Sequence, residues 1–286
     1  MSNGAGPFEM TILVDNEARQ GLLKEHGFSA WIEVAGLRVL FDTGQGPAFA
    51  ANARSLGVDP SHADMIVLSH GHFDHSGGLT LASACAPGAP VFAHPDSLGP
   101  RYAVRNGAAQ AIGMPAEARA ALEAHPAGVR WTSEAMQLAD GVGVTGPVPR
   151  LTGYEDTGGP FFIDPEGAHP DPITDDLALW VRTDRGLVVI AGCCHAGLVN
   201  TLRQAMKLSG EPRLRAVLGG FHLGEAGEAR LAETLCELRS LGPELIVPCH
   251  CTGAAAVQRL AGELGERVVP GFSGARFRFG ADRGRA

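Results

Sequence analysis

Short apolar runs separated by turn residues divide the first ninety-four positions of the chain into regular elements. Runs of four to six residues rich in β-branched side chains predict strands, and longer runs with apolar positions at helical spacing predict helices. Two neighbouring runs flank a short turn at 35–37, which predicts a hairpin. The predicted strands are 10–15, 30–34, 38–42, 65–68 and 90–94, and the predicted helices are 49–56 and 79–84.

The same kinds of pattern return after Leu177 and continue to the C-terminal region. A second hairpin comes first, and helices and strands then alternate. Two β-rich halves, each covered by helices, predict an α/β protein built as a four-layer αβ/βα sandwich. The predicted strands are 177–181, 187–191, 216–218, 245–247, 268–269 and 276–279, and the predicted helices are 196–208, 226–241 and 254–264.

Between these halves, over residues 95–175, the hydrophobic pattern weakens. Pro, Gly, Ala and isolated aromatic residues dominate this segment. Long irregular segments inside compact domains are often binding loops. We therefore expect one domain over residues 1–286, with a cap or substrate-loop insertion at 95–175.

Composition narrows the classes of function. The formal net charge of -8 and the lack of a basic run disfavour sequence-independent nucleic-acid binding, which depends on neutralising phosphates. No apolar run is long enough to cross a bilayer, and no signal peptide is visible at the N-terminus. The six cysteines do not form the spacing of a secreted disulfide framework. We expect a cytoplasmic protein whose partner is a small-molecule substrate, with no nucleic acid and no membrane bound.

Four candidate metal ligands fall within six residues, directly after the predicted strand 65–68. They are His70, His72, Asp74 and His75. His and Asp are seldom buried without partners, and imidazole and carboxylate groups suit zinc and related divalent ions. The spacing of His70 and His72 lets both project to one side of an extended segment. This pattern predicts a metal site.

Three further histidines follow predicted strands in the second half. His195, His222 and His250 come after the strands 187–191, 216–218 and 245–247. Ligands of α/β sheets gather at the carboxyl ends of strands. The three histidines are therefore candidates for the same site as the first cluster.

The segment His70-x-His72-x-Asp74-His75, together with Phe41-Asp42-Thr43-Gly44 before it, resembles the signature of the metallo-β-lactamase superfamily. Segments 175–179, 192–197, 219–223 and 249–253 narrow the resemblance. They are similar to the branch of 7,8-dihydropterin-6-methyl-4-(β-D-ribofuranosyl)aminobenzene-5'-phosphate synthase-like metal-dependent hydrolases. The resemblance spans nearly the whole chain and is weakest over the cap segment.

The resemblance implies a ligand set for one or two ions, zinc first, with Mn or Fe as alternatives. The superfamily usually adds a bridging Asp, but this chain has Cys193-Cys194-His195 at the corresponding strand end. His195 is then the remaining ligand of the first ion, with a Cys193 thiolate or His94 as alternatives, and Asp42 orients a ligating imidazole. The implied metal ligands are His70, His72 and His195 for the first ion and Asp74, His75 and His250 for the second.

The resemblance also implies hydrolysis, with metal-bound hydroxide attacking an ester, lactone, amide or phosphoester. Asp74 would orient the nucleophile or take its proton, and His222 would bind substrate or transfer a proton. One alternative is a metal-dependent transferase or synthase acting on a pterin or phosphoribosyl-type substrate. A second alternative is an iron-dependent dioxygenase.

The remaining polar residues receive simpler interpretations. Asp175 and Asp176 precede a strand and read as turn or solvent residues, although the branch resemblance implies that they lie near the site. Arg101 and Arg105 in the cap read as a solvated face, with binding of an anionic group as the alternative. The other histidines considered ordinary surface or loop residues are His26, His62, His125 and His169, and the thiols considered inert and buried are Cys194, Cys249 and Cys251.

Overall fold

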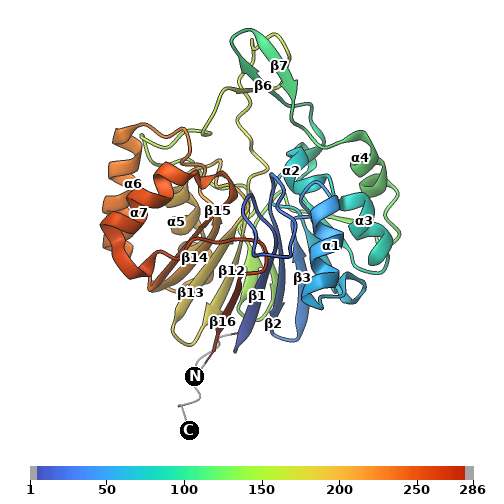
Figure 1. Cartoon of the computed structure of the whole chain (residues 1–286), viewed down its shortest axis with the longest axis horizontal. Coiled ribbons are helices and arrows are strands. Elements are labelled where there is room, and N and C mark those ends of the chain that lie inside the picture. The colour runs from blue at the N-terminus through green and yellow to red at the C-terminus, as the bar shows by residue number, and fades with distance from the viewer. Residues whose placement is uncertain (1–4, 281–286) are drawn as a thin grey trace.

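The structure is a computed structural model that describes residues 5–280. Two β-sheets lie face to face at its centre (Figure 1). The first sheet has seven strands, in the order β16 (Arg276–Phe279), β1 (Phe8–Val14), β2 (Ser29–Val34), β3 (Leu37–Phe41), β4 (Met65–Val67), β5 (Val91–Ala93) and β8 (Val129–Trp131). The second has six, in the order β15 (Leu245–Cys249), β14 (Leu214–Gly220), β13 (Gly186–Ala191), β12 (Ala178–Thr183), β10 (Val142–Val144) and β9 (Met136–Ala139).

Helices cover the outer face of each sheet (Figure 1). Those on the first sheet are α1 (Pro47–Leu56), α3 (Leu79–Cys85) and α4 (Ala116–Glu123), and those on the second are α5 (Leu198–Ser209), α6 (Glu228–Leu241) and α7 (Ala254–Leu264). One buried apolar cluster fills the space between the sheets, and a further cluster lies under each set of helices. The predicted four-layer sandwich is confirmed.

Alternation along the central strands explains these layers. In β12, Leu179 and Val181 belong to the cluster between the sheets, whereas Ala178 and Trp180 belong to the cluster under the helices. Successive side chains of a strand point to opposite faces, so a strand buried on both faces reads as one continuous apolar run. This run is what the sequence shows at this position.

Parallel strands bring the functional segments to one edge. β3, β4, β5 and β8 pair in parallel, and so do β13, β14 and β15. Their carboxyl ends therefore lie at the same edge of the sandwich, and the segments that follow them meet there. This edge is the upper one in Figure 1.

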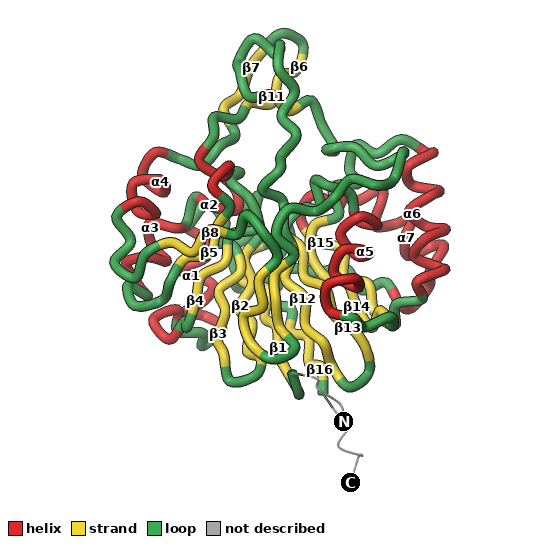
Figure 2. The backbone as a smooth tube through the Cα atoms, turned by 180° about the vertical axis from the view of Figure 1, so that it is seen from behind, coloured by secondary structure: helices red, strands yellow, loops and turns green. Residues whose placement is uncertain are grey.

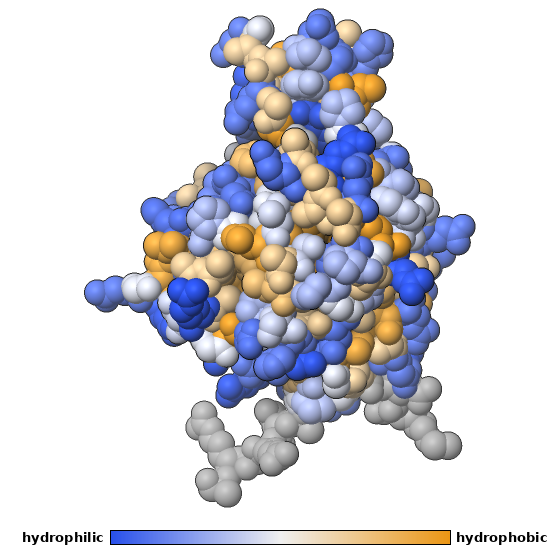
Figure 3. Space-filling view, turned by 90° about the vertical axis from the view of Figure 1, so that its right-hand side faces the viewer, coloured by the Kyte–Doolittle hydropathy of each residue, from blue (hydrophilic) through white to orange (hydrophobic). Residues whose placement is uncertain are grey.

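The segment 95–175 divides between the sandwich and a protruding part. β8, α4, β9 and β10 belong to the sandwich layers. Only a small three-stranded sheet of β11 (Phe161–Phe162), β6 (Tyr102–Arg105) and β7 (Ala108–Ala111) stands above the edge that carries the strand ends (Figure 2). The strands that join the sandwich are three or four residues long, which is too short to show a hydrophobic period. Figure 3 shows this narrow cap rising above the broader sandwich.

Short helical turns complete the structure, and one predicted strand is absent from the described part of the chain. Residues 268–269 form no strand, because Val268 makes only an isolated bridge to Ile246 after a 3-10 turn. Among the described residues, no helix is both long and apolar enough to cross a membrane. The short helical turns are η1 (Pro60–His62), α2 (Phe73–Ser76), η2 (Pro95–Leu98), η3 (His250–Thr252) and η4 (Gly265–Arg267).

Candidate metal centre

The candidate ligands of both halves meet at the carboxyl edge of the two sheets. His70 and His72 follow β4, and α2 carries Asp74 and His75. Strands β13, β14 and β15 end directly before the segments that carry the other three histidines. Those three residues are His195, His222 and His250.

One group of ligand atoms is formed by three buried histidines. His70 Nε2 lies 3.0 Å from His72 Nδ1. The ring centre of His195 lies 4.9 Å from that of His70 and 4.8 Å from that of His72. One nitrogen from each of the three rings falls within 4.8 Å of the others. The spacing suits a single divalent ion with nitrogen ligands.

A second group lies beside the first. His250 Nε2 is 3.2 Å from Asp74 Oδ2 and 3.3 Å from His75 Nε2. Cys193 Sγ is 3.1 Å from His75 Nε2, and Cys251 Sγ is 3.3 Å from Cys193 Sγ. The strand end that lacks a bridging carboxylate therefore presents a thiol to this group.

Three of the imidazoles are held by their outward nitrogen. His75 Nδ1 contacts Asp42 Oδ2 at 2.8 Å, and His250 Nδ1 contacts Asn16 Oδ1 at 2.8 Å. His195 Nδ1 contacts the carbonyl oxygen of Thr157 at 2.8 Å. Each acceptor takes the Nδ1 proton, so Nε2 is the atom that faces the centre, as in metal-ligating histidines.

Asp42 joins the two loops that carry the motif. Its carboxylate accepts hydrogen bonds from the amide and the hydroxyl of Ser69, both at 2.7 Å, as well as contacting His75. A Cβ at Gly192 would lie 2.0 Å from Ser69 Oγ. Only glycine lets the second half approach this closely. Asp42 has the orienting position that the resemblance implies.

Burial leaves most of the imidazoles neutral. It lowers the pKa of His70, His72 and His195 well below the usual range, and it lowers the pKa of His222 and His250 to about 4. Neutral imidazoles are the form that binds metals.

His75 is the exception. Burial works against its charged form, but the negative charges of Asp42 and Asp74 outweigh burial and raise its pKa to about 9. The site therefore favours a positive charge at this point. Ring nitrogens face one another at 3.0 Å between His70 and His72 and at 3.3 Å between His75 and His250. Nε2 of His72 and Nε2 of His195 have no hydrogen-bond partner among the described residues. This donor set fits a bound divalent cation.

Backbone strain also gathers here. Four non-glycine residues at the site adopt the left-handed region: Asp42 at φ 57°, Cys194 at 57°, His222 at 46° and His250 at 47°. Such residues cost free energy and persist where the surrounding structure holds them, often at functional sites.

His222 lies beside the first group of ligand atoms, which His70, His72 and His195 form. Its ring centre lies 4.3 Å from that of His195, and its ligand atom falls in one cluster with Cys193 and His195. The cap reaches over the same rings, since the centre of the Phe161 ring lies 5.5 Å from those of His72 and His195 and 5.7 Å from that of His222. The cap thus covers the candidate centre.

Sequence patterns missed two residues at this site. His26, expected to be an ordinary surface residue, has its Nε2 3.1 Å from Asp74 Oδ2 and clusters with Asp74 and His250. Asn16, which holds His250, was not singled out. Both lie between β1 and β2 and carry no local motif, so only tertiary contacts reveal them.

The interpretation of Asp175, Asp176 and Arg101 as exposed residues is wrong. All three are buried. Asp175 accepts a hydrogen bond from the Gly71 amide at 2.8 Å and pairs with Arg101 Nη2 at 2.6 Å, and Asp176 accepts one from the Ala196 amide at 2.7 Å. These carboxylates hold the backbone of the two histidine loops, a role that a turn-like composition conceals.

The other polar residues have structural surroundings of their own. His94 belongs to none of the ligand clusters found in residues 5–280, and its Nδ1 accepts a hydrogen bond from the Asp96 amide. His125 is buried, contrary to expectation, between Ser83 and the Ala89 carbonyl. His62 and His169 are exposed, and Arg105 pairs with Glu225. Cys194 and Cys249 are buried, as expected, whereas Cys251 is half-buried.

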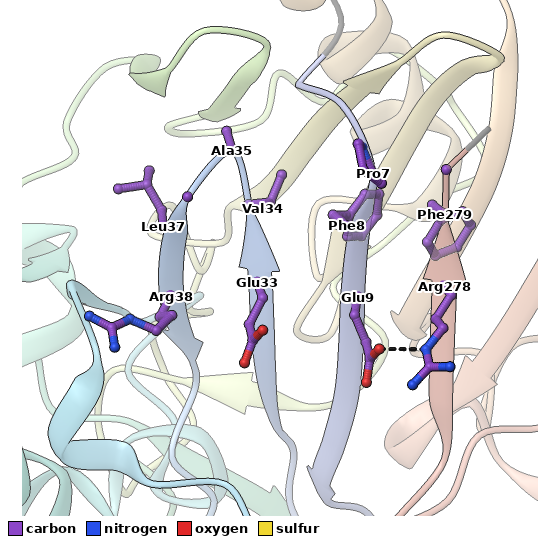
Figure 4. A pocket seen from close by; sticks show the side chains of 12 residues that line it. Pro7, Phe8, Glu9, Glu33, Val34, Ala35, Leu37, Arg38, Arg278 and Phe279 are labelled. Carbon is purple, nitrogen blue, oxygen red and sulfur yellow. Dashed lines mark hydrogen bonds and ion pairs between the residues drawn. The ribbon is translucent and has the colours of Figure 1, made fainter. Parts of the chain in front are cut away.

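Two hollows lie at different distances from the centre. A pocket of about 670 Å³ is lined by Phe8, Glu33 and Phe279 among others (Figure 4). It lies at the start of β1, whose seven residues separate it from the histidine edge by roughly 20 Å. A second hollow of about 860 Å³, between the cap and α4, is lined in part by Phe73. Phe73 belongs to the metal motif, but none of the candidate ligands lines this second hollow.

The fold and this site define a class of protein. The model of the metallo-β-lactamase superfamily matches residues 24–250. The chain therefore belongs to the metallo-β-lactamase superfamily.

Individual relatives show which members of the superfamily this chain resembles. The chain is 31% identical to the 7,8-dihydropterin-6-methyl-4-(β-D-ribofuranosyl)-aminobenzene-5'-phosphate synthase of Methanocaldococcus jannaschii, over 85% of this chain and 86% of that protein. The crystal structure of a metal-dependent hydrolase of the β-lactamase superfamily matches with a TM-score of 0.81 and 31% identity, over 94% of this chain and 98% of that one. A metallo-β-lactamase fold protein of Bacillus subtilis shares the fold alone, with a TM-score of 0.57, 12% identity, and coverage of 96% and 100%.

Proposed function

We propose that the protein is a metal-dependent hydrolase acting on an ester, lactone, amide or phosphoester of a small molecule. The observation that carries this proposal is the convergence of buried ligand atoms, including nitrogens of His70, His72 and His195 within 4.8 Å of one another. Zinc is the metal that suits this nitrogen-rich set best. One or two ions are proposed, because the second group offers Asp74, His75 and His250.

The protein residues hold and orient the reactants. A bound divalent ion would acidify a water molecule and polarise the bond to be cleaved. Asp74, whose carboxylate lies between His26 and His250, would orient the attacking water. His222, neutral because burial lowers its pKa to about 4, would donate a hydrogen bond to the developing negative charge.

A second candidate is a transferase or synthase acting on a pterin or phosphoribosyl-type substrate. The similarity to the archaeal synthase, which covers 85% of this chain and 86% of that protein, favours it. The aromatic ring of Phe161 above His72 and His195 also fits a planar substrate. Product analysis in the presence of a labelled acceptor separates the candidates, since hydrolysis leaves the label unincorporated and synthesis transfers it to product.

Replacing His72 tests the hydrolase proposal directly. We expect His72→Ala to lose bound zinc and at least a hundredfold of its turnover of a chromogenic ester or phosphodiester, because it removes one of three nitrogen ligands. His169→Ala is the matched control, since His169 is exposed, pairs with Asp164 and belongs to none of the ligand clusters within residues 5–280. Elemental analysis and initial rates give the readouts. A His72→Ala protein with full zinc content and full turnover would contradict the proposal.

A further inference from the structure

Arg230, in the first turn of α6, is a buried cation that is only partly neutralised. Its side chain is 5% exposed, and its Nη1 pairs with Asp156 Oδ1, whose own side chain is 75% exposed. Arg230 Nε and Nη2 meet no acceptor among residues 5–280. Buried guanidinium donors without acceptors are costly, so such a group in a folded protein calls for an explanation.

The two free donors form the edge of the guanidinium that binds anions best. Nε and Nη2 lie side by side on one edge of the planar group and can donate two parallel hydrogen bonds to one oxyanion. Asp156 contacts Nη1 and leaves this edge unused by the protein. The arrangement is that of a carboxylate- or phosphate-binding arginine rather than of a closed structural ion pair.

The guanidinium group of Arg230 lies near the candidate metal centre. The positive charge of Arg230 contributes, after burial and His250, to the lowered pKa of His222. Two residues beyond Asp156, the backbone of Gly158 lies against the His222 ring, where a Cβ would come within 2.1 Å of Nδ1. The segment 156–158 therefore contacts Arg230 at one end and the ring of His222 at the other.

We propose that Arg230 is the binding point for an oxyanion group of the substrate, phosphate or carboxylate, held beside His222. This inference rests on the proposed function, because it assigns an anionic small molecule to the same site. Arg230 becomes a residue that selects substrates through its Nε and Nη2 donors, while the exposed Asp156 carboxylate keeps its contact with Nη1.

Isothermal titration calorimetry of inorganic phosphate with the zinc-loaded protein tests this assignment. We expect Arg230→Gln to weaken phosphate binding roughly tenfold or more, because a charge-assisted pair of hydrogen bonds is lost. The zinc content of this variant should equal that of the wild type. Asp156→Asn should bind phosphate at least as tightly as the wild type, since it removes a competing negative charge.

Two further variants keep the test decisive. Arg105→Gln is the matched control, because Arg105 is exposed and pairs with Glu225 in a surface contact; its phosphate affinity should be unchanged. If Arg230→Gln does not fold, Arg230→Lys decides, since it keeps the charge but loses the two-donor edge and should still bind several-fold more weakly.

Equal phosphate affinity in the wild type and in Arg230→Gln, or in Arg230→Lys where only that variant folds, would overturn the assignment. So would a wild-type protein that binds no phosphate. A protein that binds phosphate through Arg230 but takes up no metal would retain the anion site and lose the proposed hydrolase function, which keeps the two failures distinct.

Discussion

At the scale of single residues, the centre is defined as much by what holds each imidazole as by the imidazoles themselves. Asp42, Asn16 and the Thr157 carbonyl each fix one ring by its outward nitrogen. These partners come from loops far apart in the chain. An orienting hydrogen bond of this kind raises the basicity of the ligand and fixes its direction.

Cys193 is the candidate ligand that distinguishes this centre from superfamily sites with a bridging Asp. Burial raises the pKa of its thiol well above the usual range, so it is a neutral thiol until an ion binds. A bound divalent ion would deprotonate it, as metal ions do with coordinating thiols. The short distance to His75 Nε2 places the sulfur beside the second group of ligands.

We expect cobalt-substituted protein to show a sulfur-to-metal charge-transfer absorption in the near ultraviolet that Cys193→Ser lacks. The physical reason is direct contact between the ion and the sulfur of Cys193. Cys85→Ser is the control, because Cys85 is an exposed cysteine outside the site. Absorption spectra after anaerobic cobalt titration provide the measurement. An identical band in Cys193→Ser, or no band in the wild type, would exclude the thiolate ligand.

At the scale of elements, Arg101 anchors the cap to the centre. It lies directly before β6, and its buried guanidinium pairs with Asp171 at 3.1 Å and with Asp175 at 2.6 Å. Asp175 in turn accepts a hydrogen bond from the Gly71 amide, between the first two histidines of the motif. The position of the cap and the position of the histidine loop are therefore set by one network.

Arg101→Gln should destabilise the protein by about 3–5 kcal/mol, because removing one partner of a buried pair leaves uncompensated charge behind. Arg105→Gln, at an exposed pair in the adjoining strand β6, should cost roughly 0–1 kcal/mol. Denaturant unfolding followed by circular dichroism measures both. Similar losses for the two variants would show that the network does not anchor the cap.

Most elements were predictable from sequence because their signals are local. Apolar periodicity located helices α1, α3, α5, α6 and α7 and the central strands, but it did not locate α4. Four ligands within six residues marked the metal motif. The short strands β8, β9 and β10 were not predicted, because three or four residues are too few to show a hydrophobic period. Asp175 and Arg101 escaped because their burial depends on partners far away in sequence, and polar composition alone suggests exposure.

At the scale of the whole molecule, the two halves meet both in the core and at the candidate centre. The apolar cluster between the sheets joins strands of both halves. The first ligand group takes two histidines from one half and His195 from the other, and the second pairs His75 with His250. A bound ion would therefore link the halves directly.

Removing the metal should lower the stability of the fold as a whole. With free zinc about a thousandfold above its dissociation constant, the metal-bound protein should be more stable by about 4 kcal/mol. Melting curves with and without a chelator measure this difference. His72→Ala should respond much less to the chelator, and an equal response of both proteins would contradict a structural contribution from the ion.

The first and last described strands run side by side. β1 and β16 pair antiparallel with Phe8 opposite Phe279, and the two rings stack with their centres 4.6 Å apart. The described chain thus begins and ends at the edge opposite the histidines. An affinity tag or fluorescent fusion attached beyond β1 or β16 should leave the histidine edge unobstructed, and a short peptide joining these two strands should allow a circular permutant with new ends in the cap hairpin.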